Sequence, residues 1–198
     1  TIARDGTLYT NFISNGCTSD TAHIAFLQWV EPWETPSLTQ DYLRYKSYSL
    51  ALPAFLGQHG YQSTFVSTAP LWFLNQRAFL ESTQFDNIVS SESFTSYPKY
   101  VFHAAADEAM YDKTEKLLLG DSSKPRFMML ETISSHKPYN APNADTEEEA
   151  FWYSDTQLLA FYRKLQGMHY FDHGILIVVG DHRKMQAIGY DEIEKWGN

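Results

Sequence analysis

The residues of this chain best suited to chemistry are Asp181 and His182, which stand side by side just after a short aliphatic run, residues 175–179. Such a run between glycines is typical of a strand buried on both faces of a parallel sheet. Open α/β sheets bind their ligands beyond the carboxyl ends of the strands, and a carboxylate beside an imidazole offers donors that zinc and related divalent ions prefer. An Asp that caps the next element, next to a surface His, is the alternative.

A hydroxyl group is the second candidate. Thr18 and Ser19 follow a turn at Gly16 and precede residues 21–30, whose pattern is helical until Pro32. Either side chain suits a helix N-cap. Alternatively, the hydroxyl is a nucleophile, and backbone N–H groups at the helix start hold its phosphate or sulfate adduct.

Three other side chains stand where a site would need them. His136 follows a second apolar strand, residues 126–133, and is either a structural histidine or a ligand at the same sheet edge as Asp181. Trp72 and Arg77 lie in a loop-like stretch. They are either core and surface residues, or an aromatic wall and a guanidinium fork for an anion.

The elements that position these residues alternate between helix and strand. The apolar periodicity, with glycines at several boundaries, predicts an α/β domain, in which helices cover both faces of a mostly parallel sheet to give a three-layer sandwich. The expected helices cover residues 49–59, 107–119 and 153–165, and the expected strands cover residues 7–13, 61–67, 126–133 and 174–180.

Composition narrows the function classes. With 198 residues, 43% of them hydrophobic, the chain is long enough for one globular domain. A net charge of −9 argues against nucleic acid as a partner. The single cysteine, Cys17, excludes an internal disulfide and a cysteine-based zinc cluster. No apolar run reaches the roughly 18 residues of a membrane span.

Five segments in order carry a family resemblance: NGCTSDTAHIAFL, LPAFLGQHGYQSTFV, ETISSHKPYNAP, YSDTQLLAFYRKL and GILIVVGDHRKM. Together they resemble the sulfatase-like branch of the alkaline phosphatase superfamily, and within it the lipoteichoic acid synthase-type phosphoglycerol and phosphoethanolamine transferases. The resemblance implies an alkaline phosphatase-like fold. It also implies that residues 1–198 form a single catalytic-domain fragment, a partial domain without the family's first strand and C-terminal part.

The resemblance assigns a nucleophile and a metal site. It implies that Thr18 is the nucleophile and that Thr18, Asp181 and His182 bind one divalent ion, which is Mn, Zn or Mg. The family also has an acidic ligand at the end of its first strand. Asp5 stands before Thr18 in a different context, and Glu131 is the alternative acid for that position.

The resemblance also implies a substrate and a location. His136 is expected to contact substrate, and Trp72 and Arg77 are the nearest matches to the residues that bind its head group. The expected function is a metal-dependent phosphotransferase or hydrolase acting on a phospholipid head group or related phosphoester. The expected location is the outer side of a bacterial cell membrane, reached through transmembrane segments of a longer protein.

Two alternatives stay open. One is a sulfatase, although the residues after Cys17 lack the Pro and Arg of the Cys-x-Pro-x-Arg pattern that formylglycine sulfatases carry. The other is a binding domain that keeps the fold without catalysis.

Overall fold

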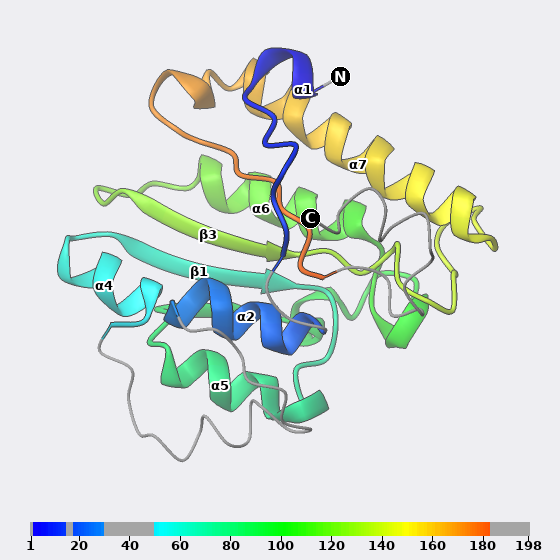
Figure 1. Cartoon of the computed structure of the whole chain (residues 1–198), viewed down its shortest axis with the longest axis horizontal. Coiled ribbons are helices and arrows are strands. Elements are labelled where there is room, and N and C mark those ends of the chain that lie inside the picture. The colour runs from blue at the N-terminus through cyan, green and yellow to red at the C-terminus, as the bar shows by residue number, and fades with distance from the viewer. Residues whose placement is uncertain (1, 15–17, 30–49, 183–198) are drawn as a thin grey trace.

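The computed structural model describes residues 2–14, 18–29 and 50–182 and has three layers (Figure 1). A sheet lies in the middle, with α6 and α7 on one face and α2, α4 and α5 on the other. The helices and strands in chain order are α1 (Ile2–Asp5), α2 (Ser19–Gln28), α4 (Leu52–Gln58), β1 (Gln62–Ser67), η1 (Phe73–Asn75), α5 (Gln76–Ser82), β2 (Asn87–Val89), η2 (Ser91–Phe94), η3 (Val101–His103), α6 (Asp107–Leu119), β3 (Arg126–Glu131), α7 (Glu147–Gly167) and η4 (Tyr170–Asp172).

The sheet of the described chain has three strands in the order β2-β1-β3, all parallel. The register pairs Gln62 with Arg126 at one end and Ser67 with Glu131 at the other. Parallel pairing brings the carboxyl ends of all three strands to one edge, and the residues that follow each strand meet there. The expected α/β three-layer fold with a parallel sheet is confirmed.

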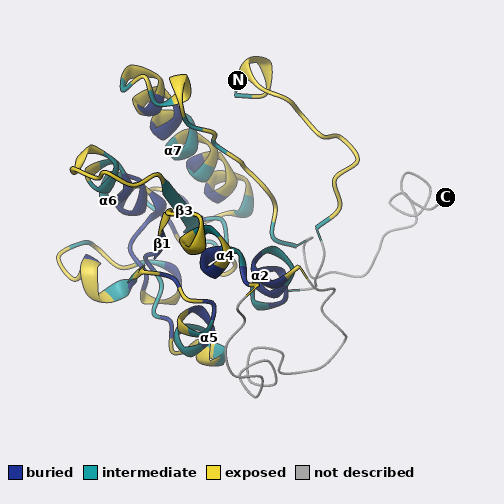
Figure 2. Ribbon diagram, turned by 90° about the vertical axis from the view of Figure 1, so that its left-hand side faces the viewer, coloured by how far each residue is buried: buried dark blue, intermediate teal, exposed yellow. Residues whose placement is uncertain are grey.

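Side chains alternate between the two faces of the central strand, as a strand buried on both sides requires. Phe65 packs toward α2 and α5, where Ile24 and Phe79 are fully buried. Its neighbour Val66 packs toward α6 and α7, against Met110. The central strand β1 is largely buried, whereas β3 is of intermediate exposure (Figure 2), so the core lies around β1.

Helix boundaries follow local chemistry. Thr18 is the N-cap of α2 in extended conformation. α7 starts at a capping box, in which Thr146 accepts the N–H of Glu149 and the Glu149 carboxylate accepts the N–H of Thr146. α6 stops where Gly120 begins. The bounds of α6 match the expected residues 107–119, and α2 starts and ends two residues before the expected 21–30. α7 starts six residues before the expected residue 153, because the capping box at Thr146 begins the helix there.

Two expected strands are absent. Residues 174–180 run without strand pairing, and Ile175 and Ile177 are each 80% exposed. Residues 7–13 are likewise irregular and exposed. Both predictions were wrong because a strand needs a neighbouring ladder for its backbone groups, and the described sheet ends at β3. Only Leu176 of the aliphatic run packs against the α6–α7 core.

A further correction concerns residues 76–82, which form α5 rather than a loop.

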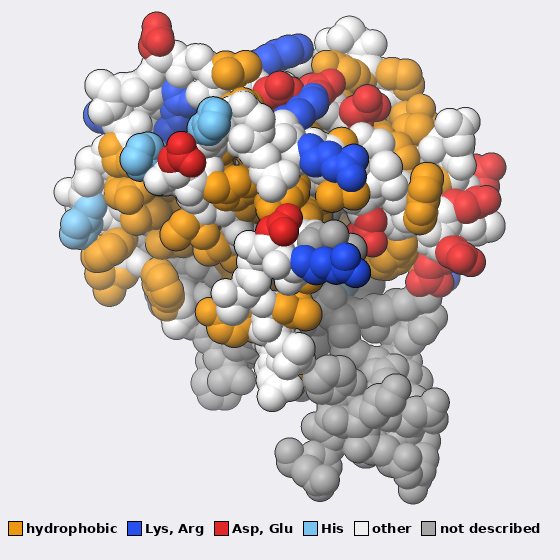
Figure 3. Space-filling model, turned by 90° about the horizontal axis from the view of Figure 1, so that it is seen from above, with side chains coloured by type: hydrophobic (Ala, Val, Ile, Leu, Met, Phe, Trp, Pro, Cys, Tyr) orange, Lys and Arg blue, Asp and Glu red, His pale blue; other side chains and the backbone are white. Residues whose placement is uncertain are grey.

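Viewed from the side of α1 and α7, hydrophobic side chains lie at the surface between charged ones (Figure 3). Within the described ranges, no helix is both long and apolar enough to cross a membrane.

Candidate active site

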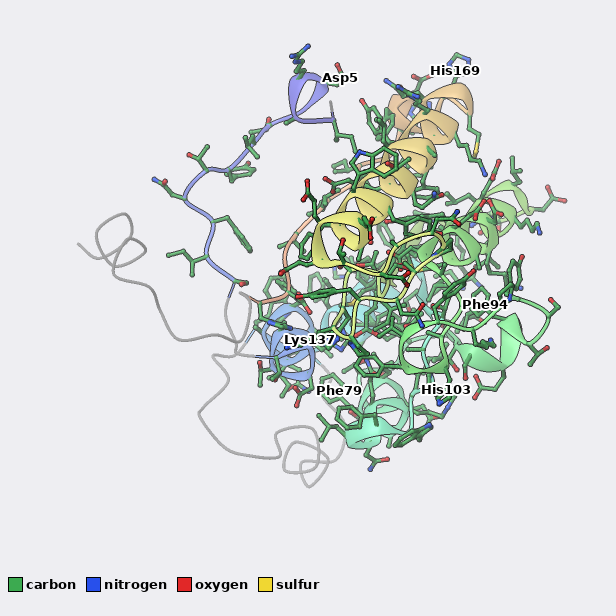
Figure 4. The ribbon with its side chains drawn as sticks, turned by 90° about the vertical axis from the view of Figure 1, so that its right-hand side faces the viewer. Asp5, Phe79, Phe94, His103, Lys137 and His169 are labelled. Atoms are coloured by element: carbon green, nitrogen blue, oxygen red, sulfur yellow. The ribbon has the colours of Figure 1, made fainter. Side chains whose placement is uncertain are left out.

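The carboxyl edge of the sheet gathers the residues singled out in the sequence. Figure 4 looks onto this edge and labels Lys137, from the turn after β3, and His103, from η3. The start of α2 reaches the same edge, as do the ends of β1 and β3. Residues from opposite ends of the sequence can therefore meet at this edge.

A hydrogen bond joins the start of α2 to the Asp181–His182 pair. The hydroxyl of Ser19 donates to Oδ2 of Asp181 over 2.6 Å, across 162 positions of sequence. The carboxylate of Asp181 also accepts the backbone N–H of His182 (2.9 Å) and lies 3.5 Å from its Nε2. The structure thus brings Thr18, which precedes Ser19, to the same corner as Asp181 and His182.

Thr18 is held by its own helix turn. Its backbone N–H donates to the hydroxyl of Thr21 over 3.1 Å, and that hydroxyl donates to the carbonyl of Thr18 over 2.7 Å. Its own hydroxyl donates to the carboxylate of Asp20. This hydroxyl therefore stands at the positive end of the α2 dipole, where negative charge is stabilised.

The donor types at this corner suit a divalent ion. A hydroxyl, a carboxylate and an imidazole are the oxygen and nitrogen ligands of Mg, Mn or Zn. Among residues 2–14, 18–29 and 50–182, no group of three or more His, Cys, Asp or Glu side chains forms a ready metal cage. The side chains of Thr18, Asp181 and His182 are of the chemical types that bind such an ion, and two of them, Asp181 and His182, are adjacent in sequence.

The two acids considered as a further ligand lie in different places. Asp5 accepts a hydrogen bond from the hydroxyl of Tyr162 on α7 (3.0 Å) and is labelled well away from Lys137 in Figure 4. Glu131 ends β3 at the carboxyl edge. Its carboxylate accepts from the amide of Gln76 (3.1 Å) and lies 3.6 Å from Nε2 of His23. Glu131, not Asp5, shares the edge with α2.

His23 was not singled out from the sequence. It is 3% exposed on α2, and its ring meets Phe65 edge-on with centroids 5.8 Å apart. Through Glu131 and Gln76 it ties α2 to β3 and α5. The only sequence signal was a polar side chain on an otherwise apolar helix face.

His136 lies in the turn after β3. Its Nδ1 donates to the carbonyl of Lys137 over 2.5 Å, and its ring contacts Phe102 with centroids 4.7 Å apart. Because a carbonyl only accepts, Nδ1 carries the proton, which leaves Nε2 for another partner.

Trp72 and Arg77 lie beyond the ends of β1 and β2. Trp72 is 77% exposed and borders an open hollow of about 400 Å³ together with Glu92, Lys99 and His103. Arg77 donates to the hydroxyl of Ser90 and to Glu92, each over 2.8 Å. Among the described residues, Arg77 is therefore paired with the segment that follows β2 and not with Asp181.

The charge of Glu92 is stabilised in this arrangement. The hydrogen bond from Ser90, followed by one from its own backbone and by Arg77, lowers the pKa of Glu92. The Arg77 guanidinium is therefore already paired with a carboxylate.

Asp107 is a second residue that the sequence analysis missed. It is 1% exposed at the start of α6, and its carboxylate accepts from two backbone N–H groups of the turn after β3. An acid in the first turn of a helix is common, so its type and position gave no sign of burial.

Comparison with known proteins agrees with this fold. One solved structure, the lipoteichoic acid synthase LtaP from Listeria monocytogenes, shares 23% identity with a TM-score of 0.76, covering 94% of this chain and 50% of that one. Another, a protein in the alkaline phosphatase superfamily from Vibrio parahaemolyticus, shares 24% identity with a TM-score of 0.71, covering 80% and 41%. These likenesses establish the fold, and the chain spans half of the first structure's length and about two fifths of the second's.

No curated protein sequence matches the chain. The family model for sulfatases, however, matches residues 1–185, which includes every candidate site residue. The alkaline phosphatase-like fold and this match agree with the resemblance carried by the sequence motifs. The chain belongs to the sulfatase family.

Proposed function

We propose that the protein containing this chain is a metal-dependent phosphotransferase or phosphoester hydrolase that uses Thr18 as its nucleophile. The observation that carries the proposal is the 2.6 Å hydrogen bond from Ser19 to Asp181. It joins the start of α2, with its hydroxyl pair, to an Asp-His pair from the far end of the chain.

Thr18, Asp181 and His182 would hold one divalent ion, with Glu131, at the carboxyl end of β3, as the candidate for a further acidic ligand. When bound, such an ion favours the ionised form of a hydroxyl and neutralises charge on phosphoryl oxygens. A threonine hydroxyl is otherwise a poor nucleophile at neutral pH.

The chain's own residues supply orientation and charge. The start of α2 places Thr18 where the helix dipole and first-turn N–H groups attract a phosphoryl group. His136 presents Nε2 toward a substrate oxygen. Asp20 accepts the Thr18 proton in a hydrogen bond, so it can orient the hydroxyl before attack.

The substrate class is inferred from family membership and from the similar solved structure, which is that of a lipoteichoic acid synthase. We infer a phospholipid head group or related phosphoester as donor, bound at the outer face of a bacterial membrane. Trp72, beside the hollow near Lys99, would stack on the head group. Arg77 would need to exchange its pairing with Glu92 for the substrate anion.

The experiment is to trap the covalent intermediate. The full-length protein is incubated with labelled phospholipid and Mn, Mg or Zn, and the peptide that holds Thr18 is examined by mass spectrometry. Phosphorylated Thr18 in the wild type and no turnover in Thr18→Ala support the proposal, and Thr18→Ser should keep part of the activity.

The two alternatives give different results in the same experiment. A modified Cys17 that is required for activity would indicate a formylglycine sulfatase and overturn the assignment; Cys17 lies outside the described residues. Absence of bound metal and of turnover with every phosphoester tested would indicate a binding domain. Activity that survives in Thr18→Ala would also refute the proposal.

A further inference from the structure

The turn that follows β3 is fixed by a buried carboxylate from another element. Oδ1 of Asp107 accepts the backbone N–H groups of Ile133 (2.8 Å) and Ser134 (3.0 Å). Oδ2 accepts the hydroxyl of Ser154 on α7 (3.1 Å), and the N–H of Asp107 donates to the hydroxyl of Ser134 (2.9 Å). One side chain therefore joins α6, α7 and the turn that leads to His136.

The segment before Asp107 holds the same turn at a second point. Phe102 of η3 contacts the His136 ring, with centroids 4.7 Å apart at 62°. Ala105 lies between Phe102 and Asp107 in the sequence. Its carbonyl accepts a hydrogen bond of 2.6 Å from the buried hydroxyl of Thr68, just after β1. The path from Phe102 to Asp107 is thus anchored to the sheet, and two of its side chains reach the turn.

We propose that Asp107 is a positioning residue: it sets the backbone at residues 133–134 and so places the His136 imidazole at the carboxyl edge of the sheet. That this affects substrate binding rests on the function proposed above. Its burial disfavours the charged carboxylate, and desolvation raises the pKa of Asp107. A buried acid with this many donors defines one backbone geometry for the turn.

The chain contains a matched control for this arrangement. Oδ2 of Asp86 accepts the backbone N–H (2.7 Å) and the hydroxyl (2.9 Å) of Ser63, and the N–H of Asp86 donates to that hydroxyl (3.0 Å). Asp86 is exposed and joins the starts of β1 and β2, so the same type of contact occurs at the opposite edge of the sheet.

The test observes His136 directly. In the full chain, the ring signal of His136 is followed by NMR and assigned with His136→Gln, and amide exchange is measured at residues 133 and 134. Asp107→Leu keeps approximate volume without an acceptor, whereas Asp107→Asn keeps a carbonyl acceptor. We expect Asp107→Leu to shift or broaden the His136 signal and to accelerate exchange about tenfold or more, and Asp107→Asn to stay within about twofold of wild type.

Asp86→Leu should leave the His136 signal in place, because its contacts lie at the other edge. An unchanged signal in folded Asp107→Leu, or an equal change in Asp86→Leu, overturns the proposal. If Asp107→Leu does not fold, Ser134→Ala and Ser154→Ala each remove one bond to Asp107. These should move the signal less and in the same direction, and no movement in either also overturns it.

A kinetic measurement separates this proposal from the proposed function. With a phosphodiester substrate, Asp107→Leu should raise KM about tenfold while kcat changes less than about threefold, since a displaced His136 weakens substrate contact. A fall in kcat alone contradicts the proposal. If the wild type turns over no phosphoester, the proposed function fails, and the NMR result alone decides the role of Asp107.

Discussion

Of two apolar segments in this chain, one is a strand of the sheet and the other is not. β3, with the sequence FMML at its centre, pairs along its whole length with β1. Residues 174–180 are more aliphatic still, yet they run unpaired with most side chains exposed. An apolar run therefore becomes a strand only where a neighbouring strand pairs with its backbone and helices cover its two faces.

The residues that follow the two segments also differ in how many described hydrogen bonds hold them. The turn after β3 receives several hydrogen bonds from the buried Asp107. The described contact that ties the end of residues 174–180 to another element is the bond between Ser19 and Asp181. Four predictions test this comparison, in order of expected effect.

The largest effect is expected when Phe65→Ala in β1 is compared with Phe12→Ala in residues 7–13, the other segment that was predicted as a strand and is not one. Phe65 is fully buried between the sheet and α2, so its loss should lower the free energy of unfolding by about 3–5 kcal/mol. Phe12 is 53% exposed, and the same change should cost less than about 0.5 kcal/mol. Urea unfolding measures both, and equal costs would contradict the fold.

A smaller effect compares Val66→Ala with Val178→Ala. Val66 is 0% exposed and packs against α6 and α7, so two lost methyl groups should cost about 2 kcal/mol. Val178 is 57% exposed, so its truncation should be nearly neutral. A cost at Val178 that matches Val66 would show that residues 174–180 are buried in solution.

The third prediction concerns pH at the exit of β3. Desolvation raises the pKa of Asp107 above its ordinary value of 3.8, so the folded state binds more protons there than the unfolded state does. The stability that this group contributes is therefore fully present below about pH 3.8 and falls as the pH rises toward the folded pKa, by at most about 1.4 kcal/mol per pH unit.

Asp107→Asn removes this titration. The free energy of unfolding of the variant should improve relative to wild type as the pH rises through that window, and the difference should be flat outside it. Asp86→Asn, at the exposed equivalent site, serves as the control. A relative stability of Asp107→Asn that declines with rising pH would show that the pKa is lowered instead.

The smallest effect tests the contact at the other exit. Ser19→Ala removes the bond to Asp181 and should cost about 1 kcal/mol or less, because the site is only partly buried. The backbone NMR signals of residues 176–182 should shift, while those of β3 stay in place. Ser82→Ala, which removes a local bond to the carbonyl of Phe79, should leave those residues unchanged. Unchanged signals of residues 176–182 in Ser19→Ala would mean that another contact holds the segment.

Much of the site was predictable from local pattern, because strand ends and helix starts carry their own signals. The step from apolar run to polar pair singled out Asp181 and His182, and the turn before a helical pattern singled out Thr18 and Ser19, of which the family resemblance favoured Thr18. The expectation for His136 at the end of β3 was met in position. Their roles in binding and catalysis stay predictions.

The alternation of helix and strand, the bounds of α2 and α6, and the parallel layer architecture could be predicted from the sequence alone, since these follow from periodicity and capping within short windows. The three-dimensional structure was needed to learn that residues 174–180 lie outside the described sheet and that Arg77 pairs with Glu92. It also decided that Asp107 is buried beneath the turn of His136. Pairing and burial depend on residues that are distant in sequence and close in the folded chain, and the pattern of a single segment does not show which residues these are.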